Sequence, residues 1–130
     1  METQPETERG WLGAMRDPQI GQSLALMHGH PERAWSVATL AANVGMSRSP
    51  FSARFAALVG DGPLSYLRKW RLRLAGDLLA HEPLSVAQVA AQVGYESEAA
   101  LSRAFRREWG VSPTTYRRRE ATPLLQTSSS

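Results

Sequence analysis

The 130-residue sequence contains no cysteine, so disulfides, thiolate zinc sites and thiol nucleophiles are excluded. Long apolar runs are also missing: none approaches the roughly 18 residues of a membrane span. The leader METQPETERG is acidic and lacks the apolar stretch of a signal peptide. We therefore expect a protein that does not contact a membrane.

Catalytic patterns are missing as well. No Ser/His/Asp grouping, carboxylate pair or glycine-rich phosphate loop stands out. His28 and His30 lie close together, but two histidines alone are more typical of a surface than of a metal site. We expect no enzyme, no metal and no cofactor.

Lysine is scarce: Lys69 is the only lysine among 15 basic residues. Residues 1–20 carry 4 acidic and 2 basic side chains, whereas residues 21–119 carry 7 acidic and 13 basic ones. A basic body suits a polyanionic partner, and arginine suits bidentate contacts to phosphate and guanine. GC-rich coding would produce the same arginine bias, so composition alone does not decide between the two explanations.

One stretch of the sequence occurs twice. SVATLAANVG at Ser36–Gly45 matches SVAQVAAQVG at Ser85–Gly94, with an offset of 49 (85 minus 36). Phe51-Ser-Ala-Arg-Phe55 then matches Leu101-Ser-Arg-Ala-Phe105 with an offset of 50 (101 minus 51). Two copies are too few for a solenoid and are what a chain with two DNA-reading units would show.

Each copy predicts a helix-turn-helix. In the second copy, Ser85 and Gln88 have capping-box spacing, and Gly94 supplies the left-handed turn that ends the first helix. The next helix follows Ser97 and buries Leu101 and Phe105, so that Ala99, Arg103 and Arg106 face outward. Such an outward face suits the DNA major groove.

At these residues the chain resembles the DNA-binding domain of the AraC/XylS family of bacterial transcription activators. The motif comprises Gly94-Tyr95, Ser97, Leu101-Ser102-Arg103, Phe105-Arg106, Gly110, Ser112-Pro113 and Tyr116-Arg117. The resemblance covers roughly residues 18–119 and implies an all-α fold of about seven helices. It also implies two helix-turn-helix subdomains joined by a long linker helix.

The expected domain boundaries follow from these patterns. A flexible arm or linker occupies 1–16, and the DNA-binding domain occupies 17–119. Within it we expect the first helix-turn-helix at 36–59, the linker helix at 63–80, the second helix-turn-helix at 85–109 and a last helix at 113–119. Residues 120–130 are expected to form a disordered tail. The buried side of the linker helix is expected to carry Leu64, Leu67, Leu74 and Leu78.

The predicted DNA contacts are of two kinds. Arg103 lies where the family places a groove-facing arginine, and the side chains expected to face bases are Arg103, Ala99, Glu98, Arg48, Ser49 and Ser52. Pro50 blurs how Arg48 and Ser49 are presented, because a helix that begins at Ser49 is also compatible with it. The side chains expected to contact phosphates are Arg54, Arg68, Lys69, Arg106, Arg107, Arg117 and Arg118. A solvated basic face would account for several of these equally well, and Arg71 suits a structural hydrogen bond as well as a DNA contact.

The sequence favours a sequence-specific regulator of transcription that binds double-stranded DNA in the cytoplasm. The resemblance implies activation through RNA polymerase, and also implies a sensor domain if the chain belongs to a longer protein. A non-specific architectural DNA-binding protein and a helical protein-interaction module are the alternatives. The sequence does not identify the operator, the effector, the regulated genes or the oligomeric state. It also does not distinguish an activator from a repressor.

Overall fold

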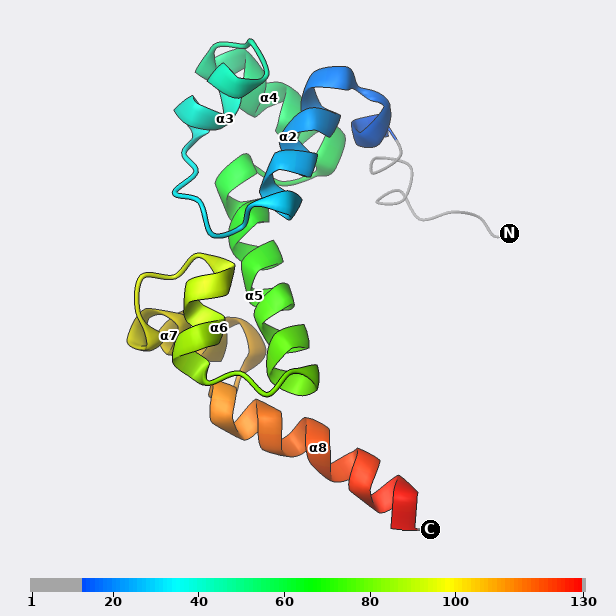
Figure 1. Ribbon diagram of the computed structural model, residues 1–130. Coiled ribbons are helices and arrows are strands. Elements are labelled where there is room, and N and C mark those ends of the chain that lie inside the picture. Colours follow the sequence, from blue (N-terminus) through cyan, green and yellow to red (C-terminus); the bar gives the residue numbers. More distant parts are fainter. Residues whose placement is uncertain (1–12, 130) are drawn as a thin grey trace, which may run out of the picture. The chain divides into compact units, whose positions relative to one another are not determined.

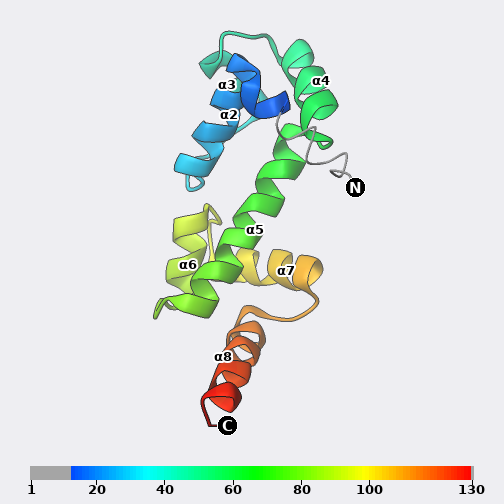
Figure 2. The same cartoon turned by 90° about the vertical axis from the view of Figure 1, so that its right-hand side faces the viewer.

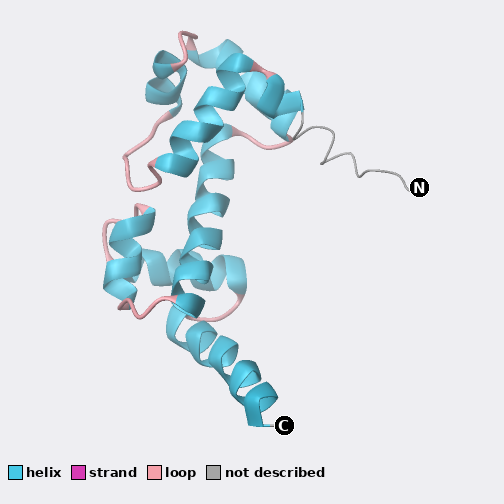
Figure 3. Ribbon diagram, turned by 45° about the vertical axis from the view of Figure 1, so that its right-hand side comes forward, coloured by secondary structure: helices cyan, strands magenta, loops and turns pink. Residues whose placement is uncertain are grey.

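The computed structural model describes residues 13–129, and the side chains only up to residue 121. Every element in this part of the chain is a helix (Figure 3). A helical stretch at 13–16 is followed by α2 (Pro18–Gly29), α3 (Val37–Asn43), α4 (Arg48–Val59), α5 (Pro63–His81), α6 (Val86–Val93), α7 (Glu98–Trp109) and α8 (Pro113–Ser129) (Figure 1). The expected all-α fold is confirmed.

The chain divides into two compact units, residues 1–68 and 69–130, and α5 begins in the first and ends in the second. In the first unit, Asp17 caps α2 by accepting hydrogen bonds from the backbone N–H groups of Gln19 and Ile20. Helix α2 contacts both α3 and α4, which form the first helix-turn-helix. Its core includes Ile20, Leu24, Met27, Leu40, Phe51 and Phe55, all at most 1% exposed.

The second unit repeats this arrangement with the C-terminal half of α5 in place of α2. One core contains Leu72, Ala75 and Leu79 of α5, Val89, Ala90 and Val93 of α6, and Leu101 and Phe105 of α7. Helices α6 and α7 lie beside this half of α5 (Figure 2), and they contact each other. The exposed face of α7 is thereby fixed by burial of its other face.

The repeat therefore extends one helix further upstream than the sequence offset of 49 shows. Ile20, Ser23 and Met27 are buried in the first unit, and Leu72, Ala75 and Leu79 are buried in the second, each at an offset of 52 (for example 72 minus 20). The offset differs because the loop after α2 (residues 30–36) is three residues longer than the loop after α5 (residues 82–85). Unequal loops and different residue types hide this part of the repeat.

Two expectations about α5 are corrected by the burial of its leucines. Leu64 is 44% exposed, so it does not belong to the buried side of α5, which carries Leu67, Leu72, Ala75 and Leu79. Leu74 and Leu78 are only partly buried against the second core. The leucine stripe predicted the wrong buried side because α5 contributes to two compact units and not to one face of a single core.

The chain ends differ from the expectation for 120–130. Helix α8 continues past residue 119 to Ser129, so the backbone of 120–129 is helical rather than a disordered tail. Most of the expected arm at 1–16 lies outside the described residues, which begin at residue 13, and 13–16 are helical.

Candidate nucleic-acid interface

The turn between α6 and α7 is built by local chemistry. Ser85 and Gln88 form the expected capping box: the Gln88 N–H donates to Ser85 Oγ at 3.0 Å, and the Ser85 N–H donates to Gln88 Oε1 at 2.8 Å. Gly94 has φ of 100°, a left-handed conformation that a side chain would strain. The Tyr95 N–H then donates to the Ala90 carbonyl at 2.9 Å. This closure sets the direction in which the chain enters α7.

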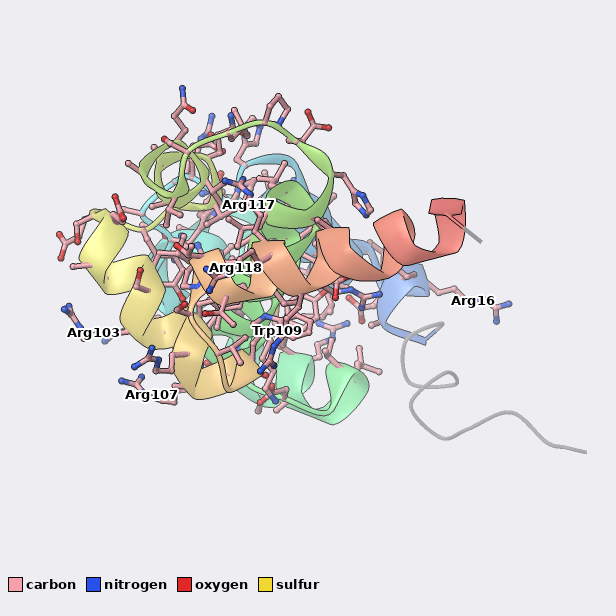
Figure 4. The ribbon with its side chains drawn as sticks, turned by 90° about the horizontal axis from the view of Figure 1, so that it is seen from below. Arg16, Arg103, Arg107, Trp109, Arg117 and Arg118 are labelled. Atoms are coloured by element: carbon pink, nitrogen blue, oxygen red, sulfur yellow. The ribbon has the colours of Figure 1, made fainter. Side chains whose placement is uncertain are left out.

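Helix α7 has one buried and one exposed face. Ser97 caps it by accepting from the Ala100 N–H at 3.0 Å, and Leu101 and Phe105 are fully buried. Glu98, Ala99, Arg103, Arg106 and Arg107 are exposed, as are Glu108 and Trp109 at the end of the helix. Figure 4 shows Arg103 and Arg107 projecting outward from the ribbon. The face expected to read DNA is therefore open to a partner.

A shallow hollow on this exposed side has the chemistry of an anion site. Its volume is about 250 Å³, and it is lined by Ser102, Arg103, Arg106 and Ser112. Guanidinium and hydroxyl groups donate hydrogen bonds to phosphate oxygens and to base edges. The hollow brings the predicted base reader Arg103 beside the predicted phosphate contact Arg106.

The first helix-turn-helix uses a variant of the same construction. Ser36 and Thr39 form the capping box of α3, and the Met46 N–H donates to the Ala41 carbonyl at 2.9 Å, as Tyr95 does to Ala90. Helix α4 begins at Arg48 behind Ser47, whose side chain makes no capping bond. The helix therefore begins at Arg48 and not at Ser49. Pro50 lies in the first turn, where backbone N–H groups have no acceptor within the helix, so its missing N–H costs no hydrogen bond.

The exposed side of α4 carries few long donors. Arg48 and Ser49 are exposed and Ser52 is half-buried. Arg48 alone among these three carries a guanidinium group. The structure thus brings the three predicted base-facing residues to the first turns of one helix, with less hydrogen-bonding reach than the matching face of α7.

Arg54 of α4 is engaged within the first unit. Its Nη2 lies 2.9 Å from Asp17 Oδ2, and its Nη1 donates to Gln19 Oε1 at 3.0 Å. Gln19 in turn donates from Nε2 to the Val44 carbonyl at 3.1 Å, in the turn between α3 and α4. These contacts favour a structural role for Arg54 beside the phosphate contact that its charge predicts.

The basic residues of α5 divide by burial. Arg68, Lys69 and Arg73 are exposed. Arg71 is half-buried; burial lowers the pKa of its guanidinium, and an electrostatic interaction with Tyr95 partly opposes this shift. Arg71 therefore lies near the turn that precedes α7, as Gln19 does in the first unit.

Trp109 is a residue whose position the sequence did not settle. It is 41% exposed, its Nε1–H donates to the Leu72 carbonyl at 3.2 Å, and its ring stacks on Phe105 at 5.8 Å between centroids. A hollow of about 480 Å³ lies beside it, lined also by Lys69, Arg73 and Glu108. Trp109 thus packs on the core and remains partly exposed to solvent.

The two predicted phosphate contacts on α8 differ. Arg118 is exposed, whereas Arg117 is half-buried and donates hydrogen bonds to three backbone carbonyl groups. A guanidinium so engaged favours a structural role.

The described part of the chain offers neither a metal site nor a membrane-spanning helix. Between residues 13 and 129, no three His, Cys, Asp or Glu side chains gather in a way that could hold a metal ion. No helix in that range is long and apolar enough to cross a membrane.

The chain is similar in sequence to known helix-turn-helix proteins. Residues 40–119 match a family described as a helix-turn-helix domain. The chain is 43% identical over 123 residues to an AraC-like transcription regulator of Streptomyces lividans, covering 95% of this chain and 40% of that protein. It is also 43% identical over 114 residues to the HTH-type transcriptional regulator AlkR of Acinetobacter baylyi, covering 88% of this chain and 37% of AlkR.

A solved structure resembles the fold closely. The DNA-binding domain of AdpA, a global transcriptional factor crystallised in complex with a target DNA, is 37% identical with a TM-score of 0.77. The match covers 82% of this chain and 96% of that one. The chain spans about two fifths of the length of the regulators named above, and nearly the whole of this DNA-binding domain.

Proposed function

Because the chain belongs to the AraC family of helix-turn-helix transcription regulators, we propose that it binds double-stranded DNA sequence-specifically and regulates transcription. Helices α4 and α7 are the recognition helices in this proposal. The observation that carries it is the exposed face of α7, where Arg103, Arg106 and Arg107 lie opposite the fully buried Leu101 and Phe105. A protein-interaction module would account for the apolar packing, but neither for the duplicated turn nor for the exposed arginines.

The residues divide into readers and anchors. Arg103, Ala99 and Glu98 of α7 face bases, together with Arg48, Ser49 and Ser52 of α4. Arg68, Lys69, Arg106, Arg107 and Arg118 contact phosphates, because their exposed cations can neutralise the DNA backbone without reading its sequence. Arg54 shares its guanidinium with Asp17 and joins a phosphate only as a second contact.

Further partners are extensions of the same proposal. RNA polymerase is the partner through which an activator of this kind would act, and a sensor domain would accompany the chain in a longer protein. Bacterial DNA lies in the cytoplasm, so we place the protein there.

Selection of binding sites from random duplexes tests the proposal, and footprinting then measures the extent of the selected site. Both reading helices lie in one chain, so we expect a monomer to protect an asymmetric site of about 20 base pairs, two major grooves one turn apart. Protection of a single half-turn, or an obligate dimer on a palindrome, would contradict this arrangement. Equal competition by unrelated DNA at moderate salt would favour a non-specific architectural protein instead.

A further inference from the structure

Arg117 reaches back from α8 to the end of α5. Its Nε donates to the Leu79 carbonyl at 2.9 Å, and its Nη2 donates to the Glu82 carbonyl at 3.3 Å and to the Leu84 carbonyl. The three acceptors lie in the last turn of α5 and in the loop that leads to Ser85, the residue that caps α6. One side chain therefore holds both ends of this loop.

The end of α5 needs such a partner. The last carbonyl groups of a helix have no intrahelical donor. Helices α4, α6 and α7 end at left-handed glycines, but α5 ends at His81 and is followed by Glu82 and Pro83. Proline has no N–H to donate. Arg117 supplies donors there, and its positive charge is also favourable at a helix C-terminus.

The first unit solves the same problem differently. The residue that matches Arg117 at the offset of 50 is Leu67, which is 2% exposed. The loop after α2 is instead held by Trp35, whose Nε1–H donates to the His30 carbonyl at 2.9 Å. The three hydrogen bonds from Arg117, which we call the arginine clamp, thus belong to the second unit, where the arginine-rich recognition helix α7 lies.

We infer that Arg117 is a positioning residue for DNA reading: it fixes loop 82–84, and thereby the start of α6, and does not contact a phosphate. Helix α6 shares one core with α7, so a displaced start of α6 shifts the packing of Val89 and Val93 against Leu101 and Phe105. The inference rests on the proposed function, because what is positioned is the second helix-turn-helix.

A lysine at this position separates the two roles. Lysine keeps the charge, but its single ammonium group lacks the planar fork that spans several carbonyl groups. A phosphate contact would therefore largely survive Arg117→Lys, whereas a clamp would not. Arg119 is exposed on the same helix and provides matched control variants, Arg119→Lys and Arg119→Met.

The experiment uses the full chain and the duplex site selected with the wild-type protein. Binding isotherms are measured at low temperature, where circular dichroism shows each variant folded, on this site and on its single-base variants. For Arg117→Lys and Arg117→Met we expect discrimination by the second helix-turn-helix to fall about tenfold, the scale of one lost base contact. The slope of log affinity against log salt should match the wild type. Amide exchange at Ser85, Gln88 and Val89, whose N–H groups donate hydrogen bonds at the start of α6, should accelerate.

Four results would overturn the clamp. The salt slope could drop by about 0.9 with discrimination intact, which is the behaviour of a phosphate contact. Arg117→Lys could behave as wild type, the Arg119 controls could lose the same discrimination, or both Arg117 variants could fail to fold, which would assign the residue to overall stability. A wild-type protein without sequence preference would refute the proposed function and not the clamp. In that case, faster amide exchange in DNA-free Arg117→Lys than in the wild type would still support the clamp.

Discussion

The arginines of this chain differ in what their guanidinium groups contact. Arg117 donates to three carbonyl groups, and Arg54 pairs with Asp17 and Gln19. Arg103, Arg106 and Arg107 stand exposed on one face of α7. Charge alone makes these residues equivalent, but a guanidinium that already binds a carboxylate or carbonyl groups must share or give up those contacts to bind a base or a phosphate.

Arg103 is the residue on which base reading should depend most. Arg103→Ala should reduce discrimination at one or two adjacent base pairs by about 1–3 kcal/mol, because arginine pairs with guanine O6 and N7. Non-specific binding should change little. Isotherms on the selected site and on every single-base variant measure both. Arg118→Ala is the control and should weaken all sequences alike; if Arg103→Ala does the same, Arg103 grips only the backbone.

His28 should make the stability of the protein sensitive to acid. Its Nε2 lies 2.6 Å from Tyr66 Oη, and burial lowers its pKa below the usual 6.5. The unfolded chain therefore takes up this proton at a higher pH than the folded one, and stability present above pH 6.5 is lost as the pH falls through the lowered pKa. Urea unfolding of wild type and His28→Gln between pH 7.5 and pH 5.5 measures this contribution. Parallel curves for the two proteins would show that His28 does not contribute.

At the scale of elements, capping decides where each helix begins and how each turn closes. Ser36, Ser85 and Ser97 all cap with side-chain hydrogen bonds, whereas Ser47 does not. The first recognition helix thus lacks the side-chain cap that the second one has. This difference adds to its shortage of long donors and places more of the expected specificity on α7.

Helix α5 offers a test of whether the two units read DNA together. One residue inserted into a helix rotates the residues beyond the insertion by about 100°. Leu72, Ala75 and Leu79 share one core, so an insertion near Gly76 would disrupt that core. The better insertion site is between Arg68 and Lys69, where the two units divide. An alanine inserted there should lower affinity for the selected site at least about tenfold, because half-site spacing and orientation are matched to the groove repeat. Circular dichroism should show helical content retained, and full affinity would mean that each unit binds on its own.

At the scale of the whole molecule, charge should set the strength of binding. The log of affinity should fall linearly with the log of salt concentration, by about 0.9 for each phosphate neutralised. Fluorescence anisotropy on the selected duplex and on an unrelated one of equal length gives both slopes. A flat titration on both duplexes would favour a protein-interaction module over a DNA-binding protein.

The sequence by itself determined where most helices begin and which faces of α4, α6 and α7 are buried. Caps at Asp17, Ser36, Ser85 and Ser97, left-handed glycines and buried positions at Phe51, Phe55, Leu101 and Phe105 all follow from residues within a few positions of each other. Local backbone conformation and helical periodicity depend on such neighbours, so a single sequence suffices to infer them. The repeat and its family motif follow for the same reason.

Tertiary structure alone decided which basic side chains remain available and which apolar ones are covered. Arg117 binds carbonyl groups 33 to 38 positions away, and Arg54 binds Gln19, 35 positions away. Leu64 is exposed although it continues a leucine stripe, and the equivalence of α2 with the end of α5 is hidden by loops of unequal length. Contacts across such distances depend on how helices pack, and no pattern of neighbouring residues encodes them.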